Sequence, residues 1–426
     1  ERATAYSKVV VIEPDRDVFQ NMNKTRQTRR ILDDDRVILF AGVNKDNILA
    51  FLTGADIFPV IFNLGHNIQH IVLNYYNKFY NDAVDIVKEY SSVLTLSWRM
   101  LGNCHIDHNI GIIQFILNID DVINNAGIDN LYGAYEGKPA ILVAAGPSLN
   151  KNIGHLKKAK GKALIFAVDA VLERLLKEGI VPDIVVTVER LRIFEAIFKK
   201  MNVPVPSEIV IAAPVLVQED TLDFFRNNKK IFFFQKGVGT QEYFNEVLSK
   251  GLVATGTASA YAALYMAHRM GFSRIALVGQ DLAYGREGSI YCEGVSGTVN
   301  ECEKKRRESN GYRVMVKDYE GNDIESNILW KDQLVAYAAF IRVNRNIKVF
   351  DATEGGAQIS GAENIRLEEY ISRFCTEDID SVYDLIGTRW QGTTDEEKFR
   401  IYGELLAKMK KDYKLFKDIK NRLEVK

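Results

Sequence analysis

The chain has 426 residues, enough for two or three domains, and 47% of them are hydrophobic, enough to build buried cores. Its 55 Lys and Arg nearly balance 56 Asp and Glu, so no basic excess suggests a nucleic acid as partner. No uninterrupted apolar stretch reaches the roughly 18 residues that span a bilayer, which argues against membrane insertion. Four widely spaced cysteines and the lack of an apolar signal region favour the cytoplasm.

Residues 1–136 are predicted to form an α/β region followed by a helical connector. Two β-branched runs, residues 7–14 and 36–42, have the character of strands, and a polar helical stretch at 15–32 separates them. This order resembles the middle of a Rossmann-like domain. From residue 63 to 128 apolar residues recur at helical spacing, which predicts the connector.

The central part of the chain, residues 137–363, alternates strand and helix patterns, which predicts an α/β fold with a Rossmann-like parallel sheet. Besides the apolar run that ends at Ala145, strands are expected at residues 163–168, 184–188, 209–212, 231–234, 274–278 and 348–350. Residues 285–325 carry six glycines and little periodicity, so we expect a lid or binding loop there. Ser326 is the expected cap of a helix that begins at Asn327. Residues 364–426 are predicted to form a C-terminal helical region of charged amphipathic helices.

Polar side chains follow the predicted strands of the central part. In doubly wound sheets ligands bind beyond the carboxyl ends of the strands, so these side chains are candidates for a site. They are Ser148, Asp169, Glu189, Thr255, Thr257, Gln280 and Asp281. The alternative for strand-end carboxylates such as Asp169 and Glu189 is that each caps the helix that follows it.

The turn Gly146-Pro147-Ser148 joins a buried strand to a segment with helical spacing. Such a turn leaves free backbone N–H groups and the positive end of a helix dipole, where α/β proteins bind phosphate. Thr255-Gly256-Thr257 opens a second helix in the same way. Because the chain lacks both the GxGxxG fingerprint and the GxxxxGK[ST] loop at these turns, neither NAD nor ATP is indicated. A nucleotide or phosphosugar site is therefore predicted.

The central part carries a set of motifs in a characteristic order. They are Pro139–Leu149 (PAILVAAGPSL), Val181–Glu189 (VPDIVVTVE), Gly279–Tyr284 (GQDLAY) and Glu354–Ala357 (EGGA). Together they resemble the motility accessory factor (Maf) family of bacterial flagellin glycosyltransferases, whose central domain is similar to bacterial sialyltransferases. The resemblance is best over residues 137–363.

The resemblance implies a reaction and a set of site residues. A nonulosonic acid of sialic, legionaminic or pseudaminic type would pass from its CMP-activated form to Ser or Thr of flagellin, in flagellar assembly and motility. No metal ion or further cofactor is expected. The tyrosines Tyr284 and Tyr291 would donate hydroxyl hydrogen bonds to the leaving phosphate. The remaining binding candidates are Gly146, Pro147, Ser148, Asp169, Glu189, Thr255, Gly256, Thr257, Gln280, Gly355 and Gly356.

The sequence departs from the family at the general base. Members commonly have a histidine in the lid, whereas this chain has Gly288–Cys292 (GSIYC) there and no histidine after His268. We therefore predict that a carboxylate acts as the base, Asp281 first, with Glu293 or Glu354 as alternatives; burial and like charge would raise the pKa of Asp281. The alternatives are that Asp281 only caps a helix and that Glu354-Gly355-Gly356 is only a turn.

Two other functions stay open on the sequence. Gly-Pro-Ser-Leu also occurs in archaeal pterin diphosphokinases of a related domain family, which would need ATP and Mg²⁺. A non-catalytic factor that binds flagellin and retains the nucleotide site is the third hypothesis. A metal site at Cys104–His108 is disfavoured, because its possible ligands are crowded and lack a spaced second pair.

Overall fold

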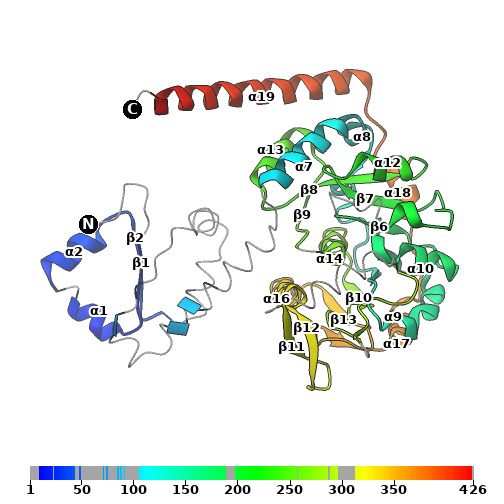
Figure 1. Cartoon of the computed structure of the whole chain (residues 1–426), viewed down its shortest axis with the longest axis horizontal. Helices are drawn as coiled ribbons and strands as arrows, with labels where there is room; N and C mark the ends of the chain where they lie inside the picture. The colour runs from blue at the N-terminus through cyan, green and yellow to red at the C-terminus, as the bar shows by residue number, and fades with distance from the viewer. Residues whose placement is uncertain are drawn as a thin grey trace. The chain divides into compact units, whose positions relative to one another are not determined.

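The computed structural model describes residues 9–22, 24–43, 105–188, 197–256, 258–285, 288–295 and 312–424, with isolated residues between 44 and 104. The chain forms two compact units, residues 1–102 and 103–426, which are described separately (Figure 1). Glu189, Thr257 and Cys104 lie outside the described residues, as do residues 286–287 and 296–311 of the predicted lid.

The first unit contains a parallel strand pair, β1 (Val9–Glu13) and β2 (Val37–Ala41). The single helix predicted between them is two helices, α1 (Arg16–Met22) and α2 (Arg26–Leu32). The hydroxyl of Thr25 accepts a hydrogen bond from the backbone N–H of Thr28 and so caps α2. This local cap explains why α2 begins where it does.

The second unit is built on a ten-stranded sheet in which every strand pair is parallel. The strand order is β14-β13-β10-β4-β5-β6-β7-β8-β3, and β9 pairs with β8. The strands are β3 (Ala126–Gly127), β4 (Pro139–Val143), β5 (Leu164–Val168), β6 (Ile184–Val186), β7 (Val210–Pro214), β8 (Lys230–Gln235), β9 (Leu252–Val253), β10 (Arg274–Val278), β13 (Lys348–Asp351) and β14 (Glu363–Asn364). The predicted α/β fold with a parallel central sheet is confirmed.

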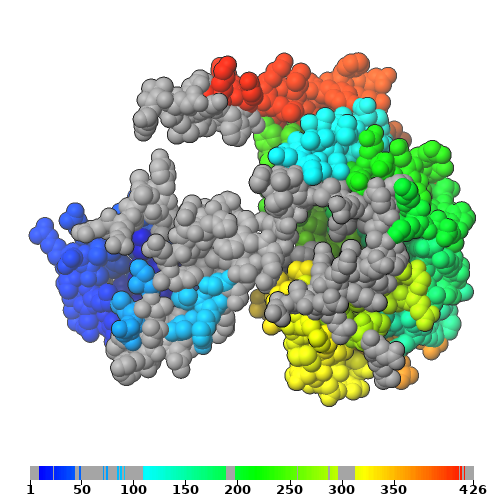
Figure 2. All heavy atoms as spheres, in the orientation of Figure 1, coloured from blue at the N-terminus to red at the C-terminus, as the bar shows by residue number. Residues whose placement is uncertain are grey.

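Three helices lie at the edge of the second unit beside β8. They are α7 (His105–Leu117), α8 (Ile119–Asn124) and the long C-terminal helix α19 (Asp395–Glu424). In the space-filling view the first part of α19, in orange and red, lies against the cyan atoms of α7 and α8 (Figure 2). The hydroxyl of Thr393, just before α19, donates a hydrogen bond to the carbonyl of Ile123.

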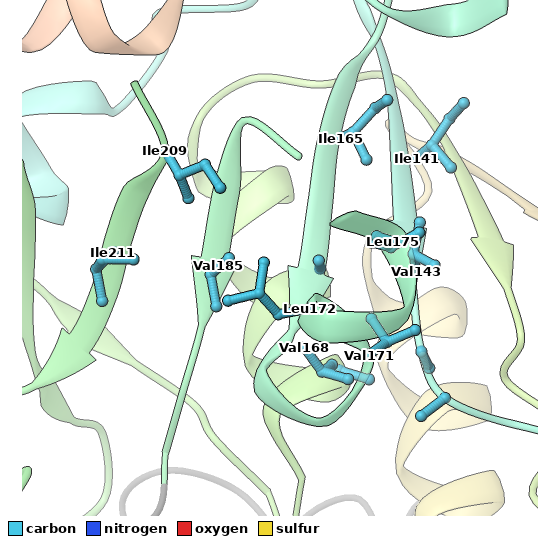
Figure 3. Close-up of a cluster of buried hydrophobic side chains, with 14 of the residues drawn as sticks. Ile141, Val143, Ile165, Val168, Val171, Leu172, Leu175, Val185, Ile209 and Ile211 are labelled. Atoms are coloured by element: carbon cyan, nitrogen blue, oxygen red, sulfur yellow. The ribbon is translucent and has the colours of Figure 1, made fainter. Parts of the chain in front are cut away.

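Helices cover both faces of the sheet, which explains why β4, β5, β6 and β7 are buried throughout. On one face Ile141, Val143 and Ile165 pack with α10 (Figure 3). On the other face Leu142 packs with α14. The first face carries α9 (Leu149–Asn152), α10 (Leu172–Lys177), α12 (Glu219–Phe224), α13 (Gly239–Leu248) and α17 (Leu367–Phe374), and the second carries α14 (Ser259–Arg269), α16 (Ile328–Val343) and α18 (Val382–Arg389).

The order of the strands identifies the switch point of the sheet. Successive strands from β4 to β8 are added on one side of β4, whereas β10 and β13 lie on its other side. The direction of winding therefore reverses between β4 and β10. Doubly wound proteins bind ligands beyond the carboxyl ends of the strands at this point.

The structure corrects the interpretation of residues 285–325 as one irregular loop. Its described second part forms an antiparallel hairpin of β11 (Arg313–Lys317) and β12 (Asp323–Asn327). The predicted cap Ser326 is also wrong, because Asn327 accepts the hydrogen bond from the N–H of Trp330 at the start of α16. The hydroxyl of Ser326 instead donates to the carbonyl of Leu282. Leu282 lies 44 residues before Ser326 in the chain, so sequence periodicity could not reveal this hydrogen bond.

Candidate functional site

The loops after β4, β10 and β13 lie next to one another at the switch point, because these strands are neighbours in the sheet. They carry Gly146–Ser148, Gln280 with Asp281, and Glu354–Gly356. The structure thus places three separate sequence motifs at one edge of the sheet.

Asp281 binds directly to the Gly-Pro-Ser turn. The hydroxyl of Ser148 donates a hydrogen bond to Oδ2 of Asp281 at 2.7 Å, and the backbone N–H of Ser148 donates to Oδ1 at 3.1 Å. The next two N–H groups, of Leu149 and Asn150, donate to the carbonyls of Gly146 and Pro147. In this structure a carboxylate of the chain itself therefore occupies the position at which the sequence predicts a phosphate.

Burial controls the acidity of Asp281, whose side chain is only 6% exposed. Loss of hydration raises its pKa to about 6, the hydrogen bonds from Ser148 and the charge of Lys151 oppose this rise, and Asp351 adds to it. Burial likewise raises the pKa of Asp351, at the end of β13, to about 6. A carboxyl group with such a pKa is ionised at pH 7 and still basic enough to accept a proton.

Glycines make room for Asp281. A Cβ atom at Gly146 would overlap Oδ2 of Asp281 and lie 2.5 Å from the carbonyl oxygen of Gly279. At Gly356, where φ is +76°, a Cβ atom would overlap the backbone of Asp281, whose carbonyl accepts a hydrogen bond from Ala357. The small size of Gly146, assigned from the sequence to close approach of a phosphate, is thus required here by the carboxylate of Asp281.

Two residues at this edge have a backbone conformation that side chains disfavour. Leu282 has φ +47° and Glu354 has φ +59°. Such conformations cost of order 1–3 kcal/mol and persist where the surrounding structure imposes them. They flank Asp281 and Gly355, so the local strain lies at the candidate site.

Glu354 is held by its own side chain. Its Oε1 atom accepts hydrogen bonds from Nδ2 of Asn152 at 3.1 Å and from the N–H of Leu367 at 3.1 Å. These bonds tie the loop after β13 to α9 and α17. In this arrangement Glu354 positions the loop, and its role as a base stays a prediction.

The structure adds residues that the sequence analysis missed. The ammonium of Lys151, one turn after Ser148, donates to the carbonyl of Glu354 at 2.8 Å and lowers the pKa of Asp281 by its charge. The hydroxyl of Thr353 accepts from the N–H of Gln280 at 3.2 Å. A spacing of three residues from Ser148 on a predicted helix was the available signal for Lys151.

The start of the predicted lid packs on the Gly-Pro-Ser turn. The N–H of Cys292 donates to the carbonyl of Ala145 at 2.8 Å, and that of Glu293 donates to Oδ1 of Asn150 at 3.2 Å. Tyr291 is partly buried and packs against the core. The described part of this segment therefore covers α9.

Tyr284 packs against the start of α16. Its side chain is buried, its ring lies 4.9 Å from that of Trp330, and its hydroxyl is 3.5 Å from Nδ2 of Asn327. These contacts join the loop after β10 to α16. Donation to a leaving phosphate stays a prediction for Tyr284 and Tyr291.

A second group of candidates lies at the start of α14. Thr255 is buried, and Gly256 has φ +53°. The hydroxyl of Ser259 donates to Oδ2 of Asp169 at 3.4 Å, while Oδ1 of Asp169 accepts from the N–H of Ala170. Asp169 directly follows β5, the neighbour of β4, so this group is one strand away from Ser148.

Two further searches cover only the part of the chain that the structure describes. Within it, no His, Cys, Asp and Glu side chains form a group of three able to hold a metal ion. No described helix combines the length and apolar character needed to cross a membrane.

Comparison with known proteins finds a family model that matches part of the chain and a solved structure with a similar fold. Residues 113–287 match the family model described as 6-hydroxymethylpterin diphosphokinase MptE-like. The structure is similar to that of the MAf glycosyltransferase from Magnetospirillum magneticum AMB-1, with a TM-score of 0.60 and 15% sequence identity. The match covers 90% of this chain and 56% of the other, so this chain spans little more than half the length of that protein. No curated protein matches the chain. The chain therefore shares its fold with this MAf glycosyltransferase.

Proposed function

We propose that the protein is a glycosyltransferase that moves a nonulosonic acid from its CMP-activated form to Ser or Thr of flagellin. The main support is one observation: a buried carboxylate, Asp281, lies at the switch point and is held there by Ser148. The likeness of the fold to a MAf glycosyltransferase supports the reaction class. The reaction would take place in the cytoplasm and contribute to flagellar assembly and motility.

The proposed chemistry needs a base on the acceptor side. As the bond from the anomeric carbon to the phosphate breaks, its electron pair leaves with CMP and the sugar gains oxocarbenium character. The acceptor hydroxyl forms the new bond to that carbon and gives its proton to Asp281. A pKa of about 6 suits Asp281 for this step near neutral pH.

The departing phosphate needs positive charge and hydrogen-bond donors. Because the N–H of Ser148 already donates to Asp281, we assign this task to the ammonium of Lys151 and to the first N–H groups of α14. The ammonium and the helix terminus would together stabilise the second negative charge that this phosphate gains as it leaves. No metal ion or further cofactor enters this proposal.

The test is transfer of a labelled sugar from CMP-nonulosonates to purified flagellin. Asp281→Asn is expected to lower the rate at least about 100-fold while leaving CMP affinity within a few-fold. Asp129→Asn is the matched control, because Asp129 is also a carboxyl whose pKa is raised by burial, but it lies near β3 at the far edge of the sheet. Equal rates for wild type and Asp281→Asn would refute the assigned base.

The family match favours a second candidate, a 6-hydroxymethylpterin diphosphokinase-like enzyme. Thermal-shift measurements distinguish the two candidates. The ligands are CMP, CMP-sugars, and a mixture of ATP, a pterin and Mg²⁺. Stabilisation by CMP alone favours the glycosyltransferase, whereas stabilisation by ATP and pterin favours the kinase. Binding of CMP and flagellin without any transfer would identify a non-catalytic flagellin-binding factor.

A further inference from the structure

The C-terminal helix α19 is fixed to the domain by one of its faces. Leu405 is buried in the core, and Ile401 packs against it. Lys408 pairs with Glu246 of α13, and its ammonium lies 3.8 Å from the centre of the Tyr243 ring. These contacts set the rotation of α19 about its own axis.

A second face of α19 carries a stripe of large apolar side chains that are exposed. The α19 stripe consists of Phe399, Tyr402, Leu406, Met409 and Tyr413. Phe399 is 78% exposed and Tyr413 is 72% exposed. The steps between these residues alternate between three and four, which is the heptad spacing that a helix uses to pack against another helix.

The exposed apolar surface continues from the α19 stripe onto α7. The hydroxyl of Tyr402 hydrogen-bonds to Asp120 at the start of α8. Ile113, Ile116 and Leu117, which precede Asp120 by one or two turns, are each more than half exposed. Apolar patches of this kind on a folded domain mark an interaction surface.

The charges along α19 select an antiparallel helix as the partner. Its first turn is acidic, with Asp395, Glu396 and Glu397. Its second half, residues 410–424, has six Lys and Arg against three Asp and Glu. When two copies of α19 pair in antiparallel fashion, each acidic end meets a basic half and the helix dipoles oppose one another favourably. A parallel pair would instead align like charges.

We propose that two copies of this chain associate through antiparallel pairing of their α19 stripes. The heptad spacing then places Leu406 opposite Met409 of the second copy and Tyr402 opposite Tyr413 of the second copy. Glu396 lies beside Lys417 of the second copy at the edge of the stripe. The association does not depend on the proposed glycosyltransferase reaction.

The first experiment measures the mass of the full chain by light scattering and sedimentation over a range of concentrations. The wild type is expected to dimerise, and Leu406→Glu with Met409→Glu to weaken the dimer at least about 100-fold, because it buries charges without partners. Ala407→Glu is the control, since it adds a glutamate to the same helix at an exposed position outside the stripe. A monomeric wild type, or equal loss in variant and control, would overturn the proposal.

A second experiment tests the direction of the pairing. Glu396→Lys is expected to weaken the dimer several-fold, because it sets two pairs of like charges against each other. Adding Lys417→Glu in the same chain should restore the affinity, because the exchanged charges again meet across the pair. If Leu406→Glu with Met409→Glu abolishes the dimer but Lys417→Glu fails to rescue Glu396→Lys, the antiparallel arrangement is excluded.

Discussion

The turns after β4 and after β9 both lead through small residues into a helix, but their helix N-termini differ. After β4, the N–H of Ser148 donates to the carboxylate of Asp281. At the start of α14, Ala258 holds the N-cap position and no described side chain caps the helix. The carboxylate of Asp281 therefore satisfies the first turn, whereas no described side chain caps the second, where we have proposed that the phosphate binds. A turn of small residues thus indicates where a helix begins, not what occupies its N-terminus.

The largest effect is expected from Gly356→Ala, which would displace Asp281 from the first turn. The new Cβ atom would overlap the backbone of Asp281 at a residue with φ +76°. Strain and overlap should lower the free energy of unfolding by about 3 kcal/mol, measured by urea denaturation. The control is Gly154→Ala, because nothing lies within 4 Å of a Cβ atom there. Equal losses in the two variants would mean that Gly356 has no special role.

The pH dependence of transfer tests whether Asp281 at the first turn is the base. Because only the ionised carboxylate accepts a proton, the rate should fall about tenfold per pH unit below a pKa of about 6. Ser148→Ala removes a hydrogen bond that lowers this pKa, so the falling limb should move to higher pH. If Ser148→Ala leaves the pH dependence of the rate unchanged, the group that controls the rate is not Asp281.

The same burial predicts how stability depends on pH. Asp281 and Asp351 have pKa values raised from 3.8 to about 6, so between these values the native state holds protons that the unfolded state has lost. Stability from these groups is present below about pH 4 and is lost as the pH rises through 6. Urea denaturation of wild type and of Asp281→Asn with Asp351→Asn measures this. The double variant should show a smaller loss over that interval.

The smallest effect is expected from Ala258→Asp, which would make the second turn resemble the first. The new carboxylate would cap α14 and should stabilise the protein by about 0.5–1 kcal/mol. It would also occupy the position proposed for phosphate, so CMP should bind about tenfold more weakly by calorimetry. Stabilisation without any change in CMP affinity would show that the phosphate does not bind at α14.

Much of the fold could be predicted because its signals are local. Continuous apolar runs that end in small residues identified the strands β4, β5 and β10 to within two residues. The hairpin of β11 and β12 was missed, because its strands are mostly exposed and lack a continuous apolar run. Asn327 was missed as a cap because Ser326 beside it is an equally good candidate in sequence terms.

The candidate site was only partly predictable. The sequence singled out Ser148, Asp281 and Glu354 separately, because each follows a strand. It did not pair the carboxylate of Asp281 with Ser148, which lies 133 residues away in the chain. Lys151 and Thr353 were missed, because only their contacts with the neighbouring loops distinguish them from ordinary surface or turn residues.

The sequence by itself determined the strand–turn–helix units, the parallel sheet and the edge at which polar residues gather, because periodicity and small turn residues act over a few positions. Only the tertiary structure decided that β10 lies beside β4, which brings Asp281 onto Ser148 and raises its pKa by burial. Strand order depends on how helices cover both faces of the sheet, a property of the whole domain. For this reason the identity of the group at each helix N-terminus could be found only in three dimensions.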